Sequence, residues 1–330
     1  AKLGNSIFLS YIPYDLPSFI ITFLKHTHPC LTLIMETEIW PNTYAACHKL
    51  GIPLFLINSR LSQKSYKGYR LIKFLISPTL NMCTKILARG KEDAHLFEKL
   101  GAQADKIEIT GNIKFDISPD PNIQGKGQQL RDALGPARPV WIAASTHDGE
   151  EEHIIAAHRQ LLKANSETLL IIAPRHPERF DQVARLCNNS SLNLARRSHR
   201  ELPAQKKAVY LADSMGELPL LYAASDLAFV GGSLASSGGH NILEPAVLEI
   251  PVITGPHTFN FSELTNLFLE KNALVQINDQ SELTDAVQTL LANADKRKQL
   301  CHQALEVVRK NQGALKATLL KIEKVLSAGK

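Results

Sequence analysis

The chain has 330 residues, 44% of them hydrophobic and 21% charged, with a net charge of +5 from 37 basic and 32 acidic residues. This composition is typical of a globular protein and excludes disordered or collagen-like chains, and the length exceeds one ordinary core, so we expect two domains. The charge surplus is mild, and we expect no nucleic-acid partner. No C-x-x-C pair occurs among the five cysteines, which indicates neither a zinc site nor a disulfide framework.

Short apolar runs of β type alternate with amphipathic segments of helical length, the pattern of parallel sheets wound by crossover helices. In the first part it predicts strands near 6–12, 31–35, 53–57, 85–88 and 107–110, and helices near 17–26, 40–50, 65–82 and 91–100. Residues 118–138 are rich in proline and glycine, so we interpret them as a linker after a first domain of residues 1–117.

The alternation resumes after the linker. It predicts strands near 139–144, 168–173, 208–212, 227–230, 251–254 and 273–277, and helical spacing from about 281 to 326 predicts two or three closing helices. The second domain is therefore expected to span residues 139–330. The basic run at 196–200, together with Lys206 and Lys207, is interpreted as a solvated loop.

Ligands of open α/β sheets bind beyond the carboxyl ends of the strands, near helix N-termini. Six predicted strands are followed there by polar or glycine-rich segments: Glu36 and Glu38, Lys114, Ser145 to His147, Arg175 and His176, Gly231 to Ser233, and Gly255 to His257. The sequence therefore predicts a ligand site at these strand ends.

Most of these residues also have a purely structural interpretation. Glu36 could cap the next helix, Lys114 could pair with Asp116, and Ser145-Thr146-His147 could simply begin a helix. Arg175 lies between prolines in P-R-H-P-E-R, and its planar guanidinium in a rigid loop favours a phosphate or carboxylate ligand.

The strongest local pattern is G-G-S-L-A-S-S-G-G-H-N-I-L-E-P-A at residues 231–246. Two glycine pairs allow the backbone to approach a ligand closely. Asn241 and Glu244 lie three residues apart on one helical face, where the carboxylate can accept hydrogen bonds from both hydroxyls of a ribose. A capping box between the same two residues is the alternative, although it does not explain the four glycines.

Two common kinds of site are not indicated. His147, His176 and His257 lack metal-ligand spacing, and neither G-x-x-x-x-G-K-[ST] nor a strand-borne G-x-G-x-x-G occurs, which argues against an NTPase and a classical dinucleotide enzyme.

Seven motifs together resemble the 3-deoxy-D-manno-octulosonic acid (Kdo) transferases of lipopolysaccharide synthesis, in the same order along the chain. They are METEIWPN (35–42), GNIKFD (111–116), STH-GEE (145–151), PRHPERF (174–180), D-S-MGEL (213–218), FVGGSL with GGHNILEPA (229–246) and GPHTFNF (255–261). The resemblance implies an α/β fold of the GT-B type, with two Rossmann-like domains, and inverting transfer of Kdo from CMP-Kdo to the lipid A precursor, lipid IVA. It implies no cofactor and no metal.

The resemblance also implies roles for individual residues. Glu36 and Lys114 match transition-state stabilisers, and possible additional site residues are Ser145, Thr146, His147, Gly239 and His240. CMP would be bound by Pro174 and Arg175, by Met215, Gly216 and Glu217, and by Asn241, Ile242, Leu243 and Glu244.

Family members carry a membrane anchor and the glutamate general base upstream of the equivalent of Ala1. From this we expect an incomplete first domain, an inactive chain as printed, and an enzyme that meets the cytoplasmic face of the bacterial inner membrane through that upstream segment. Two alternatives stay open: a GT-B enzyme for another nucleotide sugar, and a non-catalytic two-domain small-molecule binding protein.

Overall fold

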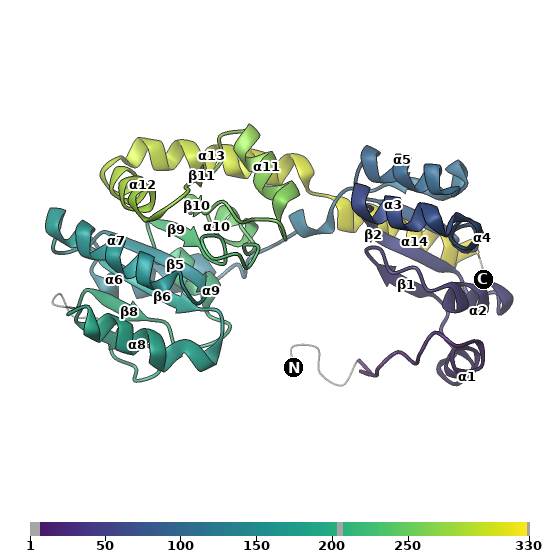
Figure 1. The fold of residues 1–330 in the computed structure, drawn as a ribbon, viewed down its shortest axis with the longest axis horizontal. Helices are drawn as coiled ribbons and strands as arrows, with labels where there is room; N and C mark the ends of the chain where they lie inside the picture. Colours follow the sequence, from purple (N-terminus) through teal and green to yellow (C-terminus); the bar gives the residue numbers. More distant parts are fainter. Residues whose placement is uncertain (1–6, 203–206, 329–330) are drawn as a thin grey trace. The chain divides into compact units, whose positions relative to one another are not determined.

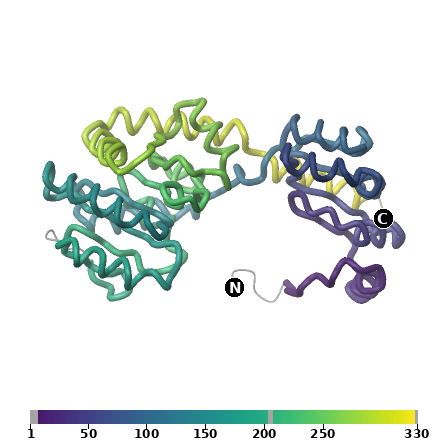
Figure 2. The backbone as a smooth tube through the Cα atoms, viewed as in Figure 1, coloured from purple at the N-terminus to yellow at the C-terminus, as the bar shows by residue number. Residues whose placement is uncertain are grey.

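The computed structural model describes residues 7–202 and 207–328. The chain divides into a first unit, Ala1–Asp116 with Asn311–Lys330, and a second unit, Ile117–Lys310. Figure 2 shows that the last, yellow segment of the tube returns to the purple and blue elements of the first unit. The chain therefore passes between the units twice.

The first unit contains a four-stranded sheet in the order β1-β2-β3-β4, with all neighbouring strands parallel. The strands are β1 (Thr32–Met35), β2 (Leu54–Ser59), β3 (Lys85–Ala88) and β4 (Ile107–Ile109). Its helices are α1 (Pro17–Thr27), α2 (Pro41–Lys49), α3 (Gln63–Leu71), α4 (Lys73–Asn81), α5 (Lys91–Leu100) and α14 (Ala314–Ala328) (Figure 1).

Strand β2 divides the core of the first unit in two. Leu54 and Leu56 belong to the cluster that contains residues of α2, α4 and α5, whereas Phe55 and Ile57 pack in a second cluster with Ile322 of α14. Successive side chains of a strand point to opposite faces, so the two clusters lie on opposite faces of the sheet. The C-terminal helix thus covers a face of the first unit.

The second unit contains a seven-stranded parallel sheet in the order β11-β10-β9-β5-β6-β8-β7. Its strands are β5 (Val140–Thr146), β6 (Leu169–Pro174), β7 (Leu194–Arg196), β8 (Val209–Leu211), β9 (Leu227–Val230), β10 (Val252–Thr254) and β11 (Val275–Gln276). Every residue of β5, β6 and β9 is buried, as in a parallel sheet covered on both faces.

Helices cover both faces of this sheet, as Figure 1 shows. They are α6 (Ile123–Leu134), α7 (Glu151–Ala164), α8 (Phe180–Asn189), α9 (Leu218–Ala223), α10 (Leu243–Val247), α11 (Ser262–Glu270), α12 (Gln280–Ala292) and α13 (Ala294–Asn311). Among the described residues, no helix combines the length and the apolar character that a membrane span needs.

The predicted domain boundaries are wrong at two places. Residues 118–138 are not a linker, because they contain α6, which buries Ile123, Leu130 and Leu134 in the core of the second unit. The second domain does not run to residue 330 either, because the apolar face of α14 packs on the first unit.

Three smaller predictions also fail. Residues 7–12 form no strand, since none of the strands in the described part of the chain pairs with them, and the Phe8 side chain is 88% exposed. The helix predicted over 65–82 is two helices, because the backbone leaves the helical conformation at Ile72. Strand β7 begins just before the basic run and was not predicted. Residue 6 and Lys206 lie outside the described residues.

Candidate functional site

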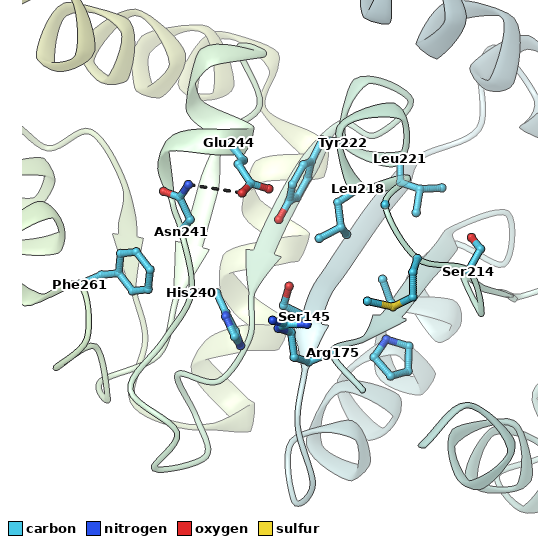
Figure 3. Close-up of a pocket in the computed structure, with 14 residues that line it drawn as sticks. Ser145, Arg175, Ser214, Leu218, Leu221, Tyr222, His240, Asn241, Glu244 and Phe261 are labelled. Carbon is cyan, nitrogen blue, oxygen red and sulfur yellow. Dashed lines mark hydrogen bonds between the residues drawn. The ribbon is translucent and has the colours of Figure 1, made fainter. Parts of the chain in front are cut away.

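A pocket of about 240 Å³ lies in the second unit, beyond the carboxyl ends of β5 and β6 (Figure 3). Helix α9 and the segments after β8, β9 and β10 complete it. It is lined by Ser145, Ala173, Pro174, Arg175, Ser214, Met215, Gly216, Leu218, Leu221, Tyr222, His240, Asn241, Glu244 and Phe261. Residues from all three predicted CMP elements are thus brought together.

Six other predicted residues do not line the pocket but lie next to residues that do. Ile242 and Leu243 are buried, and Gly239 donates its N–H to the carbonyl oxygen of Gly232. Glu217, Thr146 and His147 hold neighbouring parts of the site in place, as described below.

Glu244 is the carboxylate of the pocket. Asn241 Nδ2 donates to Glu244 Oε1 at 3.3 Å, and Asn241 Oδ1 accepts from the N–H of Leu243. The alternative, a capping box, does not form as expected: Ile242 and not Asn241 is the N-cap of α10, and Glu244 accepts from the side-chain amide of Asn241 rather than from its backbone N–H. Burial raises the pKa of Glu244, although the bond from Asn241 opposes this shift. A carboxylate held in this way is suited to accept hydrogen bonds from a ligand.

The loop that contains Met215 and Gly216 is fixed by an ion pair behind it. Arg197 donates from Nε and Nη2 to the two carboxylate oxygens of Glu217, at 3.1 and 2.7 Å. The hydroxyl of Ser214 also donates to Glu217. The hydrogen bonds from Arg197 lower the pKa of Glu217. Glu217 therefore supports the loop from below the pocket surface.

Two residues of the basic run, Arg196 and Arg197, form ion pairs within the second unit. The interpretation of the run as a solvated loop is therefore wrong at these two positions. Arg196 lies in β7 and donates from Nε to Asp213 at 2.6 Å and from Nη1 to Asp181 at 2.8 Å, while Arg197 holds Glu217. Local sequence does not reveal these partners, because they come from other segments of the fold.

Three histidines gather near Arg175. Nε2 of His147 lies 2.7 Å from Nε2 of His240, with the rings stacked, and His176 meets the ring of His147 edge-on. Burial, together with the neighbouring His147 and Arg175, lowers the pKa of His240 to about 4. The imidazole of His240 is therefore neutral at pH 7, whereas Arg175 supplies a fixed positive charge.

Strand β5 ends in a strained turn. Ser145, on the pocket wall, has φ of 55°, and the pairing with β6 is irregular between Ala144 and Thr146. A non-glycine residue in the left-handed region is uncommon and often belongs to a functional site. Thr146 turns inward and donates to buried Glu151 at 3.0 Å, which also binds Arg179 at 2.8 Å.

Glu150 organises the glycine-rich loop from inside the protein. Its carboxylate is fully buried and accepts hydrogen bonds from the backbone N–H groups of His147, Gly232, Ser233, Leu234 and Ala235. A Cβ atom at Gly231 would lie only 2.9 Å from Glu150 Oε2, which explains one of the four glycines. In the sequence, Glu150 stands out only as part of the STH-GEE motif.

The predicted residues of the first unit form a pair of their own. Glu36 Oε1 lies 3.5 Å from Lys114 Nζ, and each side chain is 44% exposed. The capping alternative for Glu36 is wrong, because Asp15 accepts hydrogen bonds from the N–H groups of Asn42 and Thr43 at the start of α2. Asp116, the alternative partner of Lys114, accepts from the N–H groups of Gly313 and Leu315.

Within the described ranges, no group of three or more His, Cys, Asp or Glu side chains is arranged to hold a metal ion. Transfer without a metal or cofactor stays a prediction.

Comparison with known proteins places these features in a family. The family model of 3-deoxy-D-manno-octulosonic-acid transferases (kdotransferases) matches residues 1–117, and that of glycosyl transferases group 1 matches residues 139–307. The 3-deoxy-D-manno-octulosonic acid transferase of Haemophilus influenzae is 42% identical over 97% of this chain and 75% of its own length. The chain belongs to the Kdo transferase family. The Kdo transferase of Bordetella pertussis is 34% identical over 95% of this chain and 73% of its own length.

Solved structures agree with this assignment. The C-terminal CMP-Kdo-binding domain of WaaA from Acinetobacter baumannii is 41% identical, with a TM-score of 0.55 over 57% of this chain and 99% of that one. Anabaena HepE in complex with UDP is 14% identical, with a TM-score of 0.56 over 95% of this chain and 85% of its own. The second likeness concerns the fold alone. The predicted GT-B fold, with parallel sheets in two units, is confirmed.

Proposed function

We propose that this Kdo transferase moves Kdo from CMP-Kdo to the lipid A precursor, lipid IVA, in lipopolysaccharide biosynthesis. One observation carries the donor assignment: a single pocket is lined by residues of all three predicted CMP elements, among them Arg175, Met215 and Glu244. The 41% identity to a CMP-Kdo-binding domain supports the same donor.

In the proposed complex, residues of the three CMP elements bind different parts of the nucleotide. Glu244 accepts hydrogen bonds from the ribose hydroxyls, and Met215 and Gly216 contact the nucleotide from the loop after β8. Arg175 binds the phosphate, because a guanidinium forms paired hydrogen bonds with phosphate oxygens.

The reaction requires one bond to form as another breaks. The acceptor oxygen bonds to the anomeric carbon of Kdo and loses its proton to a general base, while the bond from that carbon to the phosphate oxygen breaks and CMP leaves as a dianion. Fixed positive charge stabilises the departing dianion. Arg175 supplies such charge, and Glu36 and Lys114 act as transition-state stabilisers.

Calorimetric titration tests the donor. We expect CMP to bind more tightly than UMP or AMP, and equal affinity for UMP would favour a transferase of another nucleotide sugar. A transfer assay with CMP-Kdo and lipid IVA tests the reaction itself. For this assay the chain is extended by the upstream segment that family members carry. CMP binding without transfer by the extended enzyme would favour a non-catalytic binding protein.

Two further expectations remain predictions. The printed chain is predicted not to transfer Kdo on its own, and the enzyme is predicted to work at the cytoplasmic face of the inner membrane. Transfer by residues 1–330 at the rate of the Haemophilus influenzae enzyme would place the general base within this sequence. Glu36 and Glu38 would then be the first candidates, of which Glu38 accepts a hydrogen bond from Trp40 at 2.9 Å.

A further inference from the structure

Helices α3 and α4 of the first unit expose an uncommon combination of side chains. Leu71, at the end of α3, and Phe74, at the start of α4, are each 80% exposed, and Leu75 is 42% exposed. Single exposed apolar residues are normal, but contiguous large ones mark a surface that meets something other than water. We name Lys64, Lys67, Arg70, Leu71, Lys73, Phe74 and Leu75 the α3–α4 surface.

Helix α4 is apolar on both faces. Its inner face buries Ile76, Thr79 and Leu80 in the first unit, whereas Phe74 and Leu75 point away from that core. A helix that packs one face on a protein core normally presents polar residues on the other face. The outer face of α4 therefore fits an apolar environment.

Helix α3 supplies positive charge beside this apolar area. Residues 63–81 contain four basic residues, Lys64, Lys67, Arg70 and Lys73, and no acidic residue. All four are exposed, and none forms an ion pair with a described residue. Lys64, Lys67 and Leu71 share one face of α3 by their spacing.

The acidic groups close to α3 are fewer than the four basic residues. Burial and the nearby Glu38 raise the pKa of Tyr69, and Asp93 accepts a hydrogen bond from the N–H of Leu61, before the helix begins. Glu92 of α5 accepts a hydrogen bond from Gln63 at the first residue of α3, at the opposite end of the helix from Arg70. The charge and the apolar area thus meet where α3 ends, at Arg70 and Leu71, and α4 begins, at Lys73 and Phe74.

We propose that the α3–α4 surface docks this enzyme on an anionic bilayer, with Leu71 and Phe74 inserted among the lipids and the basic side chains on the headgroups. Basic residues close to an anionic leaflet are attracted to it, and apolar side chains beside them enter the interface. Long Lys and Arg side chains can reach the headgroups while their stems stay in contact with apolar groups. The proposal rests on the proposed function in one respect, since a lipid acceptor lies in such a bilayer.

Co-flotation of the chain with vesicles tests the proposal without any Kdo transfer. We expect binding to vesicles of phosphatidylcholine and phosphatidylglycerol (7:3), weaker binding to pure phosphatidylcholine, and release from the mixed vesicles as NaCl is raised. Lys67→Gln/Arg70→Gln should lower the partition coefficient roughly 25-fold, from about fivefold per charge. Leu71→Ser should lower it as well.

Matched variants separate docking from general effects. Lys296→Gln/Lys298→Gln removes two exposed charges from α13, and Leu202→Ser removes an exposed leucine of the second unit; both should leave binding unchanged. All variants should retain CMP binding and their melting temperature. If the wild-type chain does not bind CMP, the proposed function is contradicted, whereas the result on vesicle binding remains valid.

Three results would overturn the docking proposal. The first is equal binding of the wild-type chain to mixed and pure phosphatidylcholine vesicles, and the second is an equal loss in the control variants. The third is a wild-type dimer, by light scattering, that Leu71→Ser converts to monomers, since the surface would then be an interface between copies of this chain.

Discussion

Glu36 and Lys114 meet at 3.5 Å although they follow the two edge strands of one sheet, β1 and β4. The turn that carries Lys114 is held near the middle of the sheet, because Asn58 at the end of β2 accepts a hydrogen bond from the N–H of Ile113. An ion pair between two such exposed side chains adds about 0–1 kcal/mol to stability. This small gain in stability does not explain why Glu36 and Lys114 lie together.

We expect Glu36→Ala and Lys114→Ala to reduce kcat and kcat/KM together, by about 100-fold or more, with CMP affinity unchanged. That pattern indicates an interaction made mainly in the transition state. Steady-state kinetics in an enzyme preparation that transfers Kdo measure it. Lys126→Ala, which breaks the exposed ion pair with Asp120, is the control and should keep full activity. A fall in melting temperature alone would assign Glu36 and Lys114 a structural role.

Glu244→Gln is expected to weaken CMP binding by about 1–3 kcal/mol, since the amide accepts fewer hydrogen bonds from the ribose. It should also raise the stability of the unliganded protein at pH 7. The raised pKa of Glu244 means that ionising it costs more in the folded than in the unfolded state, so its contribution falls as pH rises above about 4.5. Calorimetry and urea unfolding measure the two effects, with exposed Glu249→Gln as the control. Unchanged CMP affinity would remove Glu244 from the site.

Arg197→Lys is expected to weaken CMP binding about tenfold, because lysine cannot reproduce the two hydrogen bonds that hold Glu217. The fold should persist, since the pair lies at the edge strand of the sheet. Arg200→Lys changes an exposed residue of the same run and serves as the control. If both variants bind CMP as the wild type does, the ion pair does not position the loop of Met215.

Glu150→Gln is expected to destabilise the second unit by about 3 kcal/mol or more. An amide offers one acceptor oxygen to the five N–H groups that now share two, and its NH₂ group would face backbone donors. Urea unfolding measures the loss, and exposed Glu152→Gln should behave as the wild type. Equal stability of the two variants would show that water replaces the carboxylate.

The stability of the protein should fall as pH drops from about 6.5 towards 4. The pKa of His240 is lowered to about 4 by burial, so the unfolded chain takes up a proton that the folded chain resists. The stability from neutral His240 is therefore complete above pH 6.5 and is lost below it. His240→Gln should lose less stability over this interval than the wild type does, whereas exposed His153→Gln should lose as much. Parallel curves for wild type and His240→Gln would contradict the shift.

The sequence predicted those parts of the site that depend on strand ends. Arg175, Met215 and Glu244 could be expected together because parallel strands end at one edge of a sheet, and the pocket contains all three. Glu150 could not be found in this way, since its partners are backbone N–H groups that have no signature in the sequence.

The fold was predictable to a similar extent. Apolar runs identified most strands, but the run at 6–12 has no neighbouring strand to pair with among the described residues. Helical spacing identified the closing helices without indicating which sheet each of them covers. The assignment of α14 to the second domain failed for that reason.

The return of α14 has a consequence for the order of folding during synthesis. Ile322 completes the cluster of Phe55, Ile57 and Leu87, yet it leaves the ribosome after all of Ile117–Lys310 has been translated. At bacterial and eukaryotic elongation rates this interval is roughly 10–40 s. One face of the nascent sheet stays open to water or to a chaperone for that time. The unit that is synthesised first is therefore the last to complete its core.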